Sequence, residues 1–172
     1  RMNRLWKDIL NLSRLQSWQI EYNFSEFNLV NLIQSVIEDI KTNIKDKNIQ
    51  LYSPDKVYIS TDKDKIKEVI INLLNNAFKF TYKNVNIQFN IKEEKNSIII
   101  EVSDNGIGIP SGQLQYIWER FYQVDRSRRP DKEGTGLGLS IVKEIIEGLG
   151  GKIQVESKEK KGSKFTINLP KN

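Results

Sequence analysis

The succession of helical and extended segments in this 172-residue chain predicts a two-layer α/β sandwich, in which three helices cover one face of a mixed β-sheet. Two patterns support this prediction. In some segments apolar residues recur every three or four positions, as on the buried side of an amphipathic helix. In others apolar and polar residues alternate, as in a half-buried strand, and turn-forming residues separate the segments.

The composition indicates a globular protein, with 38% hydrophobic and 28% charged residues. The net charge is +5, but the lysines are scattered without a basic aromatic platform, so we expect no nucleic-acid partner. The chain has no Cys and no His, which excludes disulfides, imidazole metal ligands and a histidine phosphoacceptor within it. No apolar run is long enough to span a bilayer, and because the chain begins with Arg we expect a fragment of a larger protein.

The N-terminal segment predicts a helix from Met2 to Gln16 that packs against a partner helix. Its apolar residues Leu5, Ile9 and Leu12 continue from Met2 at 3, 4, 3 spacing. The alternative is a helix that packs on the chain's own domain, because a short isolated helix needs a tertiary partner to persist.

The other elements are predicted from residue 22 onward. Helices are expected at Leu29 to Ile44, Ile66 to Thr81 and Leu139 to Leu149. Strands are expected at Tyr22 to Phe27, Ile49 to Leu51, Val57 to Ser60, Val85 to Ile91, Ser97 to Ser103, Lys152 to Ser157 and Lys164 to Leu169. The strands before and after the turn Glu93 to Asn96 are expected to form a hairpin.

The helix from Ile66 to Thr81 has the most informative pattern, with Asp62 as its expected N-cap. At about 100° per residue, one broad arc is apolar: Ile66, Val69, Ile70, Leu73, Leu74 and Ala77. A narrow polar stripe runs beside it: Glu68, Asn72, Asn76 and Lys79. Ile71 and Phe78 border the stripe on its far side, so it fits either a solvated face or the working edge of a buried helix.

Four sequence blocks decide between these interpretations. They are NLLNNAFKF at 72–80, DNGIGIP at 104–110, WERF at 118–121 and GTGLGLS at 134–140. In this order they resemble the N box, first glycine box, F box and second glycine box of the ATP-binding catalytic domain of sensor histidine kinases. That domain belongs to the GHKL or Bergerat-fold superfamily, with DNA gyrase and the mismatch-repair ATPases. The resemblance implies that residues 1–20 end the second helix of a dimerisation hairpin and that residues 21–172 form the catalytic domain.

In the N box, the resemblance implies that ATP and Mg²⁺ are bound along the polar stripe. Asn76 is the expected metal ligand, since an amide oxygen suits Mg²⁺ without adding a charge that repels the triphosphate. Asn72 supports the metal and the γ-phosphate side, and Lys79 neutralises phosphate oxygens as a point charge. Phe80 offers a ring to the nucleoside.

In the first glycine box, Asp104 follows a strand directly. Its carboxylate can accept a hydrogen bond from the exocyclic amine of adenine, which guanine lacks at that position. The alternative for Asp104 is an Asx turn. Asn105, Gly106 and Gly108 let the backbone pass close to the base, and Ile109 completes the predicted nucleotide-binding set of this block.

The second glycine box leads straight into a helix, so its backbone N–H groups and the helix dipole can face the phosphates. The predicted binding residues are Gly134, Thr135, Gly136, Leu137 and Gly138, although the side chains of Leu137 and Leu139 are expected to pack inward. Ser163 lies where relatives often place a hydroxyl near the adenine.

Between the F box and the second glycine box, the segment QVDRSRRPDKEG at 123–134 is rich in charge and resembles the family's lid over ATP. Relatives commonly have Arg where this chain has Gln123. Arg126, Arg128 or Arg129 could supply the guanidinium, and Arg128 matches a basic lid position best; the alternative is that these are solvated loop charges.

We therefore predict a protein-histidine kinase whose catalytic residues are Asn72, Lys79 and Arg128. It transfers the ATP γ-phosphoryl group to a histidine on its own dimerisation domain, outside this chain, for relay to a response regulator. The whole protein is expected to be a membrane-anchored homodimer with this domain in the cytoplasm. Three alternatives are a hydrolytic ATPase, a serine kinase of the anti-sigma type, and a nucleotide-sensing module without activity. Asn72 disfavours the hydrolase, because it stands where those enzymes have a Glu general base.

Overall fold

The computed structural model describes residues 21–43, 48–81, 84–124 and 135–171. The predicted helix at residues 2–16, Gly134 and the lid arginines, Arg128 among them, lie outside the described residues. Three helices are present in the described part: α2 (Leu29–Asn43), α3 (Lys63–Phe80) and α4 (Gly138–Gly148). A short 3₁₀ helix spans Ser111–Gln113, which the sequence did not predict.

Seven strands were predicted, and the described residues contain seven. They are β1 (Phe24–Asn28), β2 (Asn48–Tyr52), β3 (Tyr58–Asp62), β4 (Asn86–Glu93), β5 (Ser97–Asp104), β6 (Lys152–Lys158) and β7 (Gly162–Pro170). Five form the main sheet in the order β2-β4-β5-β7-β6. The sheet is mixed, because β2 pairs with β4 in parallel while the other neighbours are antiparallel.

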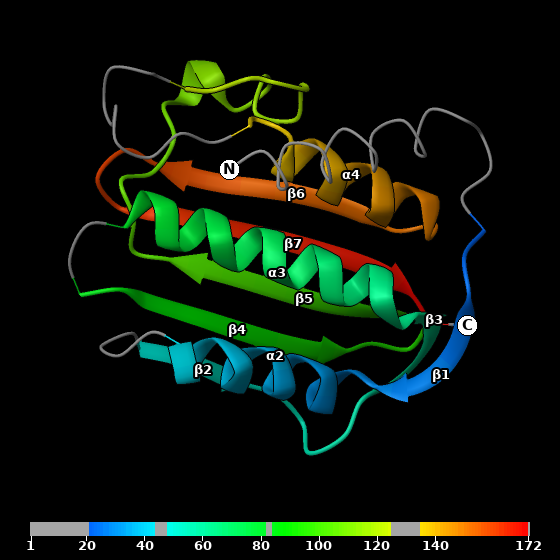
Figure 1. Cartoon of the computed structure of the whole chain (residues 1–172). Coiled ribbons are helices and arrows are strands. Elements are labelled where there is room, and N and C mark those ends of the chain that lie inside the picture. The colour runs from blue at the N-terminus through cyan, green and yellow to red at the C-terminus, as the bar shows by residue number, and fades with distance from the viewer. Residues whose placement is uncertain (1–20, 44–47, 82–83, 125–134, 172) are drawn as a thin grey trace.

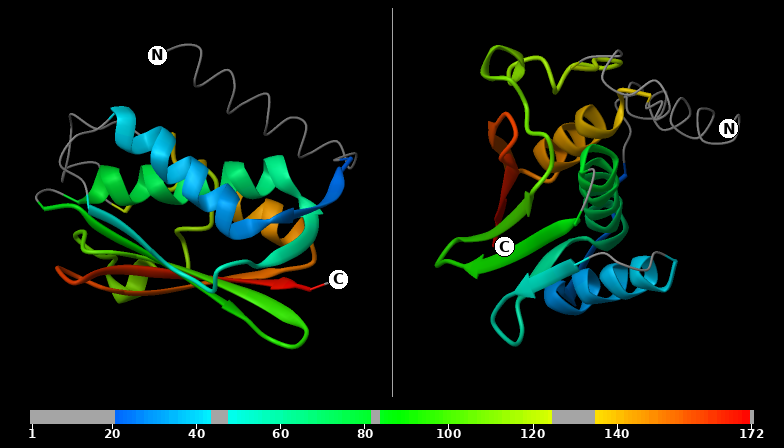
Figure 2. Two further views of the ribbon diagram at one scale, coloured as in Figure 1. Left: turned by 90° about the horizontal axis from the view of Figure 1, so that it is seen from below. Right: turned by 90° about the vertical axis from the view of Figure 1, so that its left-hand side faces the viewer.

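The three helices lie side by side on one face of this sheet, with α3 between α2 and α4 (Figure 1). Viewed from below and from the side, the helices form one layer and the strands the other, so the predicted two-layer sandwich is confirmed (Figure 2). The core lies between the layers, where Leu74 of α3, Phe89 of β4 and Ile100 of β5 are all 0% exposed. All six residues of the predicted apolar arc of α3 are buried.

The two short strands on either side of Ser53-Pro54-Asp55 do not pair with each other. β2 joins the main sheet, whereas β3 pairs with β1 in a separate two-stranded antiparallel sheet. The tertiary structure decides this, because both short strands satisfy their hydrogen bonds with distant partners that local patterning does not identify.

Candidate functional site

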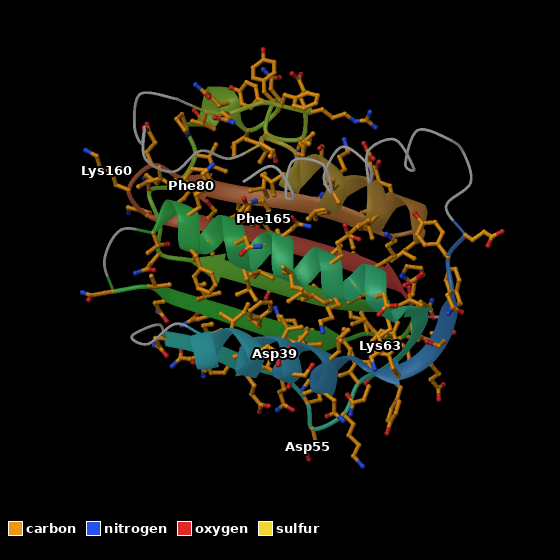
Figure 3. The ribbon with its side chains drawn as sticks, viewed as in Figure 1. Asp39, Asp55, Lys63, Phe80, Lys160 and Phe165 are labelled. Atoms are coloured by element: carbon orange, nitrogen blue, oxygen red, sulfur yellow. The ribbon has the colours of Figure 1, made fainter. Side chains whose placement is uncertain are left out.

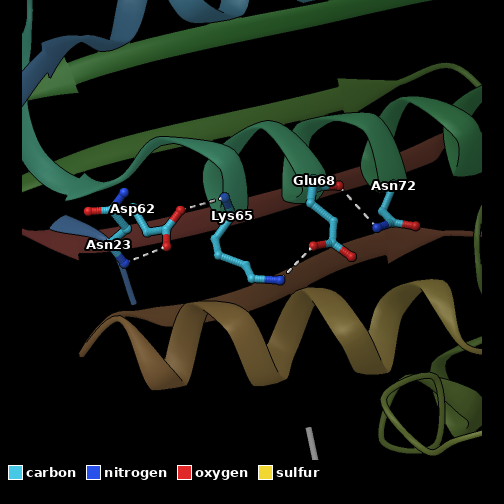
Figure 4. A network of polar contacts seen from close by, with 5 residues as sticks. All are labelled: Asn23, Asp62, Lys65, Glu68 and Asn72. Atoms are coloured by element: carbon cyan, nitrogen blue, oxygen red, sulfur yellow. Dashed lines mark hydrogen bonds and ion pairs between the residues drawn. The ribbon is translucent and has the colours of Figure 1, made fainter. Parts of the chain in front are cut away.

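The N-terminus of α3 is fixed by the carboxylate of Asp62, as predicted. One carboxylate oxygen accepts a hydrogen bond from the backbone N–H of Lys65 at 3.0 Å, and the other accepts from the N–H of Asn23 at 2.9 Å. Lys65 Nζ in turn lies 3.0 Å from Glu68 Oε2. Figure 4 shows this row of polar contacts running along α3 as far as Asn72.

The side chain of Asn72 is held in one orientation by the helix itself. Its amide nitrogen donates to the backbone carbonyl of Glu68 at 3.0 Å (Figure 4). Its amide oxygen therefore faces the neighbouring helix α4: a Cβ placed on Gly138 would lie 3.4 Å from this oxygen and 3.9 Å from the amide oxygen of Asn76. The structure thus brings Asn72, Asn76 and Gly138 together at the N-terminus of α4, where free N–H groups favour an anion.

The C-terminal end of α3 brings two further predicted residues together. Lys79 Nζ lies over the ring of Phe80, 4.8 Å from its centroid, and Phe80 is 39% exposed. Phe80 follows Asn72 by eight positions, which corresponds to about 12 Å along a helix axis. Asn72 and Phe80 are therefore separated along α3 by a distance suited to an extended nucleotide.

Asp104, the last residue of β5, lies beside this end of α3. Its Oδ1 accepts from the backbone N–H of Gly106 at 2.8 Å, so the Asx-type contact considered above is present. Burial raises the pKa of the Asp104 carboxyl, and backbone hydrogen bonds from Gly106 and Ser163 oppose that rise. Because a carboxylate has about four lone-pair positions, these contacts leave it able to accept from a ligand.

The glycines of the first box make room for other parts of the protein. A Cβ on Gly106 would lie 2.7 Å from both Asp104 Oδ1 and the carbonyl oxygen of Phe80. Gly108 has φ +68°, and its Cβ would lie only 2.0 Å from the carbonyl oxygen of Lys158. Both glycines are therefore required by packing.

Ile107 joins this box to two other elements. Its N–H donates to the carbonyl of Phe80 at 3.0 Å, and its carbonyl accepts from the N–H of Lys160 at 2.7 Å. Figure 3 shows Phe80 and Lys160 at the same end of the molecule, where α3 ends and β6 turns into β7. Asn105 donates to the carbonyl of Asn84 and accepts from the N–H of Asn86, both at 2.8 Å. Its amide thus braces the loop after α3.

Ser163 is the cross-strand neighbour of Asp104 and is therefore close to its carboxylate. Its hydroxyl contacts that of Ser157 at 2.9 Å. Sequence reasoning missed Ser157. The available signal was its position, since it continues the inward-facing row of Ile153 and Val155 in β6 as a polar residue.

Thr81 is a second residue that sequence reasoning missed at this end of the site. It is 5% exposed. Among the described residues, its Oγ1 is the one buried polar side-chain atom that has no hydrogen-bond partner. The hydroxyl lies 3.1 Å from the position that a Cβ on Gly106 would take. Its signal was that Thr81 continues the apolar arc of α3 four residues after Ala77.

The F box holds the second glycine box through main-chain and charge contacts. Arg120 pairs with Glu144 of α4 at 2.7 Å. The N–H of Phe121 donates to the carbonyl of Gly136 at 3.0 Å. Gly136 has φ +73°, and a Cβ there would lie 2.6 Å from the carbonyl carbon of Phe121, so this glycine too is required by packing.

Leu137 is 1% exposed and its side chain belongs to the core, as predicted, while Leu139 is partly buried against the core. Any contact of Leu137 with a ligand must therefore come from its backbone, whose N–H faces the hydroxyl of Thr135 at 3.4 Å. Ile109 is partly buried as well, and its N–H donates to Ser157 Oγ at 2.8 Å.

The residues present fit a magnesium ion held jointly with a nucleotide. Within the described ranges, no group of three or more His, Cys, Asp or Glu side chains is gathered for a metal. Asn76 is half-buried, and its amide oxygen, beside the N-terminus of α4, is the kind of single neutral oxygen that Mg²⁺ takes when phosphates complete its ligands.

Comparison with known proteins identifies the family. The family described as histidine kinase-, DNA gyrase B-, and HSP90-like ATPase matches residues 61–172. The sensor histidine kinase WalK of Bacillus subtilis (strain 168) is 35% identical over 175 residues, which cover 99% of this chain and 28% of that protein. The chain therefore spans well under a third of this relative's length.

Two solved structures extend the likeness. The catalytic domain of histidine kinase ThkA is 31% identical with a TM-score of 0.76, covering 87% of this chain and 98% of that one. ThkA in complex with the response regulator protein TrrA is 26% identical with a TM-score of 0.78, covering 99% of this chain and 49% of that one. This chain belongs to the family of histidine kinase-, DNA gyrase B- and HSP90-like ATPases, and within it corresponds to the ATP-binding catalytic domain of the sensor histidine kinases.

Proposed function

We propose that this chain binds Mg-ATP and presents the γ-phosphoryl group to a histidine on a dimerisation domain that lies outside it. The observation that carries the proposal is the placement of Asn72 and Asn76 opposite Gly138 at the N-terminus of α4. This arrangement combines neutral oxygens with the positive end of a helix, which suits the phosphates of a nucleotide. Mg²⁺, when bound there, would neutralise phosphate charge.

Transfer rather than hydrolysis is favoured by the absence of a general base at Asn72. An amide cannot take a proton from water at neutral pH, and the amide nitrogen of Asn72 already donates to the carbonyl of Glu68. The carboxylate of Glu68 is ion-paired with Lys65. The imidazole of the acceptor histidine is itself the nucleophile. In the transfer, the bond between the β–γ bridging oxygen and the γ-phosphorus breaks while the nitrogen–phosphorus bond forms. The chain needs only to position ATP and to balance its charge during this step.

We propose that the adenine base binds at the C-terminal end of α3, beside Phe80 and Asp104. Asp104 retains acceptor capacity beside the partly exposed ring of Phe80, and an exocyclic amine on the base can donate to it. Lys79 would act on phosphate oxygens as a point charge. We further propose that Arg128 of the lid contributes a guanidinium to the γ-phosphate.

The partners follow from the family. One of the similar structures is the complex of ThkA with the response regulator protein TrrA, so we propose that the phosphoryl group passes to a response regulator here too. None of the helices that the structure describes combines the length and apolar character needed to cross a membrane. On the same grounds we propose that residues 1–20 form the end of a dimerisation helix. We also propose that the whole protein is a membrane-anchored homodimer and that this domain lies in the cytoplasm.

The test supplies this chain with Mg-ATP and the separate histidine-bearing hairpin of its parent protein. We expect acid-labile, base-stable label on the hairpin and very slow release of phosphate without it. Asn76→Ala should lose Mg²⁺-dependent binding and transfer, whereas Asn75→Ala, at the exposed neighbouring position, should retain both. Label on a Ser of this chain would support the anti-sigma class. Steady hydrolysis at the rates of ordinary enzymes, about 1 to 10³ per second, would contradict the kinase proposal.

A further inference from the structure

The hydroxyl of Ser157 makes three polar contacts beside the proposed base-binding end of the site. The backbone N–H of Ile109 donates to Ser157 Oγ at 2.8 Å. Ser157 Oγ donates to the carbonyl oxygen of Gly162 at 2.9 Å. The same Oγ lies 2.9 Å from Ser163 Oγ, where geometry alone leaves either hydroxyl free to be the donor.

Counting hydrogens settles the direction of the third contact. A serine hydroxyl has one proton and two lone pairs. The carbonyl of Gly162 can only accept, so the proton of Ser157 is used there. The N–H of Ile109 can only donate, so it takes one lone pair. The remaining lone pair of Ser157 must accept the proton of Ser163.

The hydroxyl of Ser163 consequently has no proton left for a ligand. What it presents beside Asp104 is a pair of lone pairs, and the Asp104 carboxylate is also an acceptor. The two residues are direct cross-strand neighbours, so their side chains lie on the same face of the sheet. This corner of the site therefore accepts hydrogen bonds from a ligand and donates none through these side chains.

We propose that Ser157 is a positioning residue for base selection: by taking the proton of Ser163, it makes the wall beside Asp104 acceptor-only. An adenine amine offers two N–H donors to such a wall. A purine with a carbonyl at the same ring position places an acceptor against acceptors, which leaves buried polar groups unpaired and is strongly disfavoured. The inference rests on the proposed nucleotide site and adds the residue that sets its polarity.

The experiment measures the dissociation constants of Mg-ATP and Mg-ITP for this chain by calorimetry. ITP is the matched probe, since it differs from ATP only in having a carbonyl and a ring N–H where adenine has the amine and a bare ring nitrogen. In Ser157→Ala the proton of Ser163 becomes available to the ITP carbonyl. We expect the preference for ATP over ITP to fall about three- to tenfold, the range that one neutral hydrogen bond provides.

Two companion variants separate this role from a general structural one. Ser157→Thr keeps the hydroxyl and should keep the native preference, provided that its melting curve shows a folded protein. In a Ser163→Ala background, Ser157→Ala should leave the ATP/ITP ratio unchanged, because Ser157 acts through Ser163. A double-mutant cycle measures this coupling directly, and comparing the two nucleotides cancels any loss of affinity that they share.

The outcomes are distinguishable from those of the proposed function. Native protein that prefers ATP, with Ser157→Ala weakening both nucleotides equally, would overturn the role of Ser157 and leave the nucleotide site standing. An equal effect of Ser157→Ala in both backgrounds would overturn it as well. Native protein that binds neither nucleotide, or both alike, would overturn the proposed adenine site and this inference together.

Discussion

The two glycine-rich segments of this chain look alike in sequence, but their glycines have different surroundings. In the first, oxygen atoms of the protein lie very close to both glycines. The nearest is 2.7 Å from the hypothetical Cβ of Gly106 and 2.0 Å from that of Gly108. In the second, Gly136 is equally confined by Phe121. Near Gly138, the described part of the chain places only the amide oxygens of Asn72 and Asn76, at 3.4 Å and 3.9 Å from its hypothetical Cβ.

The difference shows that a glycine motif does not say what its missing side chain makes room for. At Gly108 the space is filled by the β6–β7 turn, so the glycine stabilises the fold. At Gly138 the space lies between α3 and α4, beside two polar amides, and we propose that it accommodates the phosphates of the ligand. The comparison makes opposite predictions for the same substitution at the two places.

Gly108→Ala should have the largest effect. The new methyl group would meet the carbonyl oxygen of Lys158 at 2.0 Å on a backbone with φ +68°, so both overlap and strain oppose folding. We expect a loss of about 3 to 5 kcal/mol in the free energy of unfolding, measured by urea denaturation. Gly112→Ala is the control, because no atom of the described segments lies within 4 Å of the corresponding Cβ position. Equal stability of the two variants would break the comparison.

Gly138→Ala should leave the fold intact and weaken the ligand instead. Alanine favours a helix over glycine by about 1 kcal/mol, and 3.4 Å from Asn72 Oδ1 is an ordinary contact, so stability should stay the same or rise. The methyl group enters the space proposed for the phosphates, and we expect the affinity for Mg-ATP to fall by about tenfold or more. Native affinity in calorimetry would show that the phosphates lie elsewhere.

Thr81→Val tests whether the buried hydroxyl beside the first glycine box destabilises the ligand-free protein. Among the described residues its hydroxyl is buried without a hydrogen-bond partner, and replacing it with a methyl group of similar size removes the cost of that burial. The free energy of unfolding of the ligand-free protein should rise by about 1 kcal/mol. Thr81→Ser, which keeps the hydroxyl, should show no such gain. A less stable valine variant would mean that the hydroxyl has a partner in solution.

Asp104→Asn should give the smallest change in stability, with a characteristic dependence on pH. Burial raises the carboxyl pKa, so the folded protein holds the proton more tightly than the unfolded chain does. Native stability therefore falls as pH rises from the usual Asp pKa to the raised one, and the loss persists above it. The variant cannot titrate, so its advantage over native protein should grow across that window and then stay constant. The same advantage at every pH would contradict the raised pKa.

The sequence by itself predicted the layers and most of the elements, because their patterns are local. Periodicity identified α3 and its buried arc, Asp62 was recognised as a cap, and the ordered blocks identified the family. The separate sheet of β1 and β3 was not predicted, since strand pairing depends on partners distant along the chain.

Tertiary structure alone decided what the site residues face. Asn72 and Gly138 are far apart in sequence, and only the packing of α3 against α4 sets their atoms close together. Ser157 is an ordinary strand residue until the β6–β7 hairpin folds over the first glycine box and gives its hydroxyl three contacts. Hydrogen-bond direction and close approach depend on atoms from several elements at once, and a one-dimensional pattern cannot encode them.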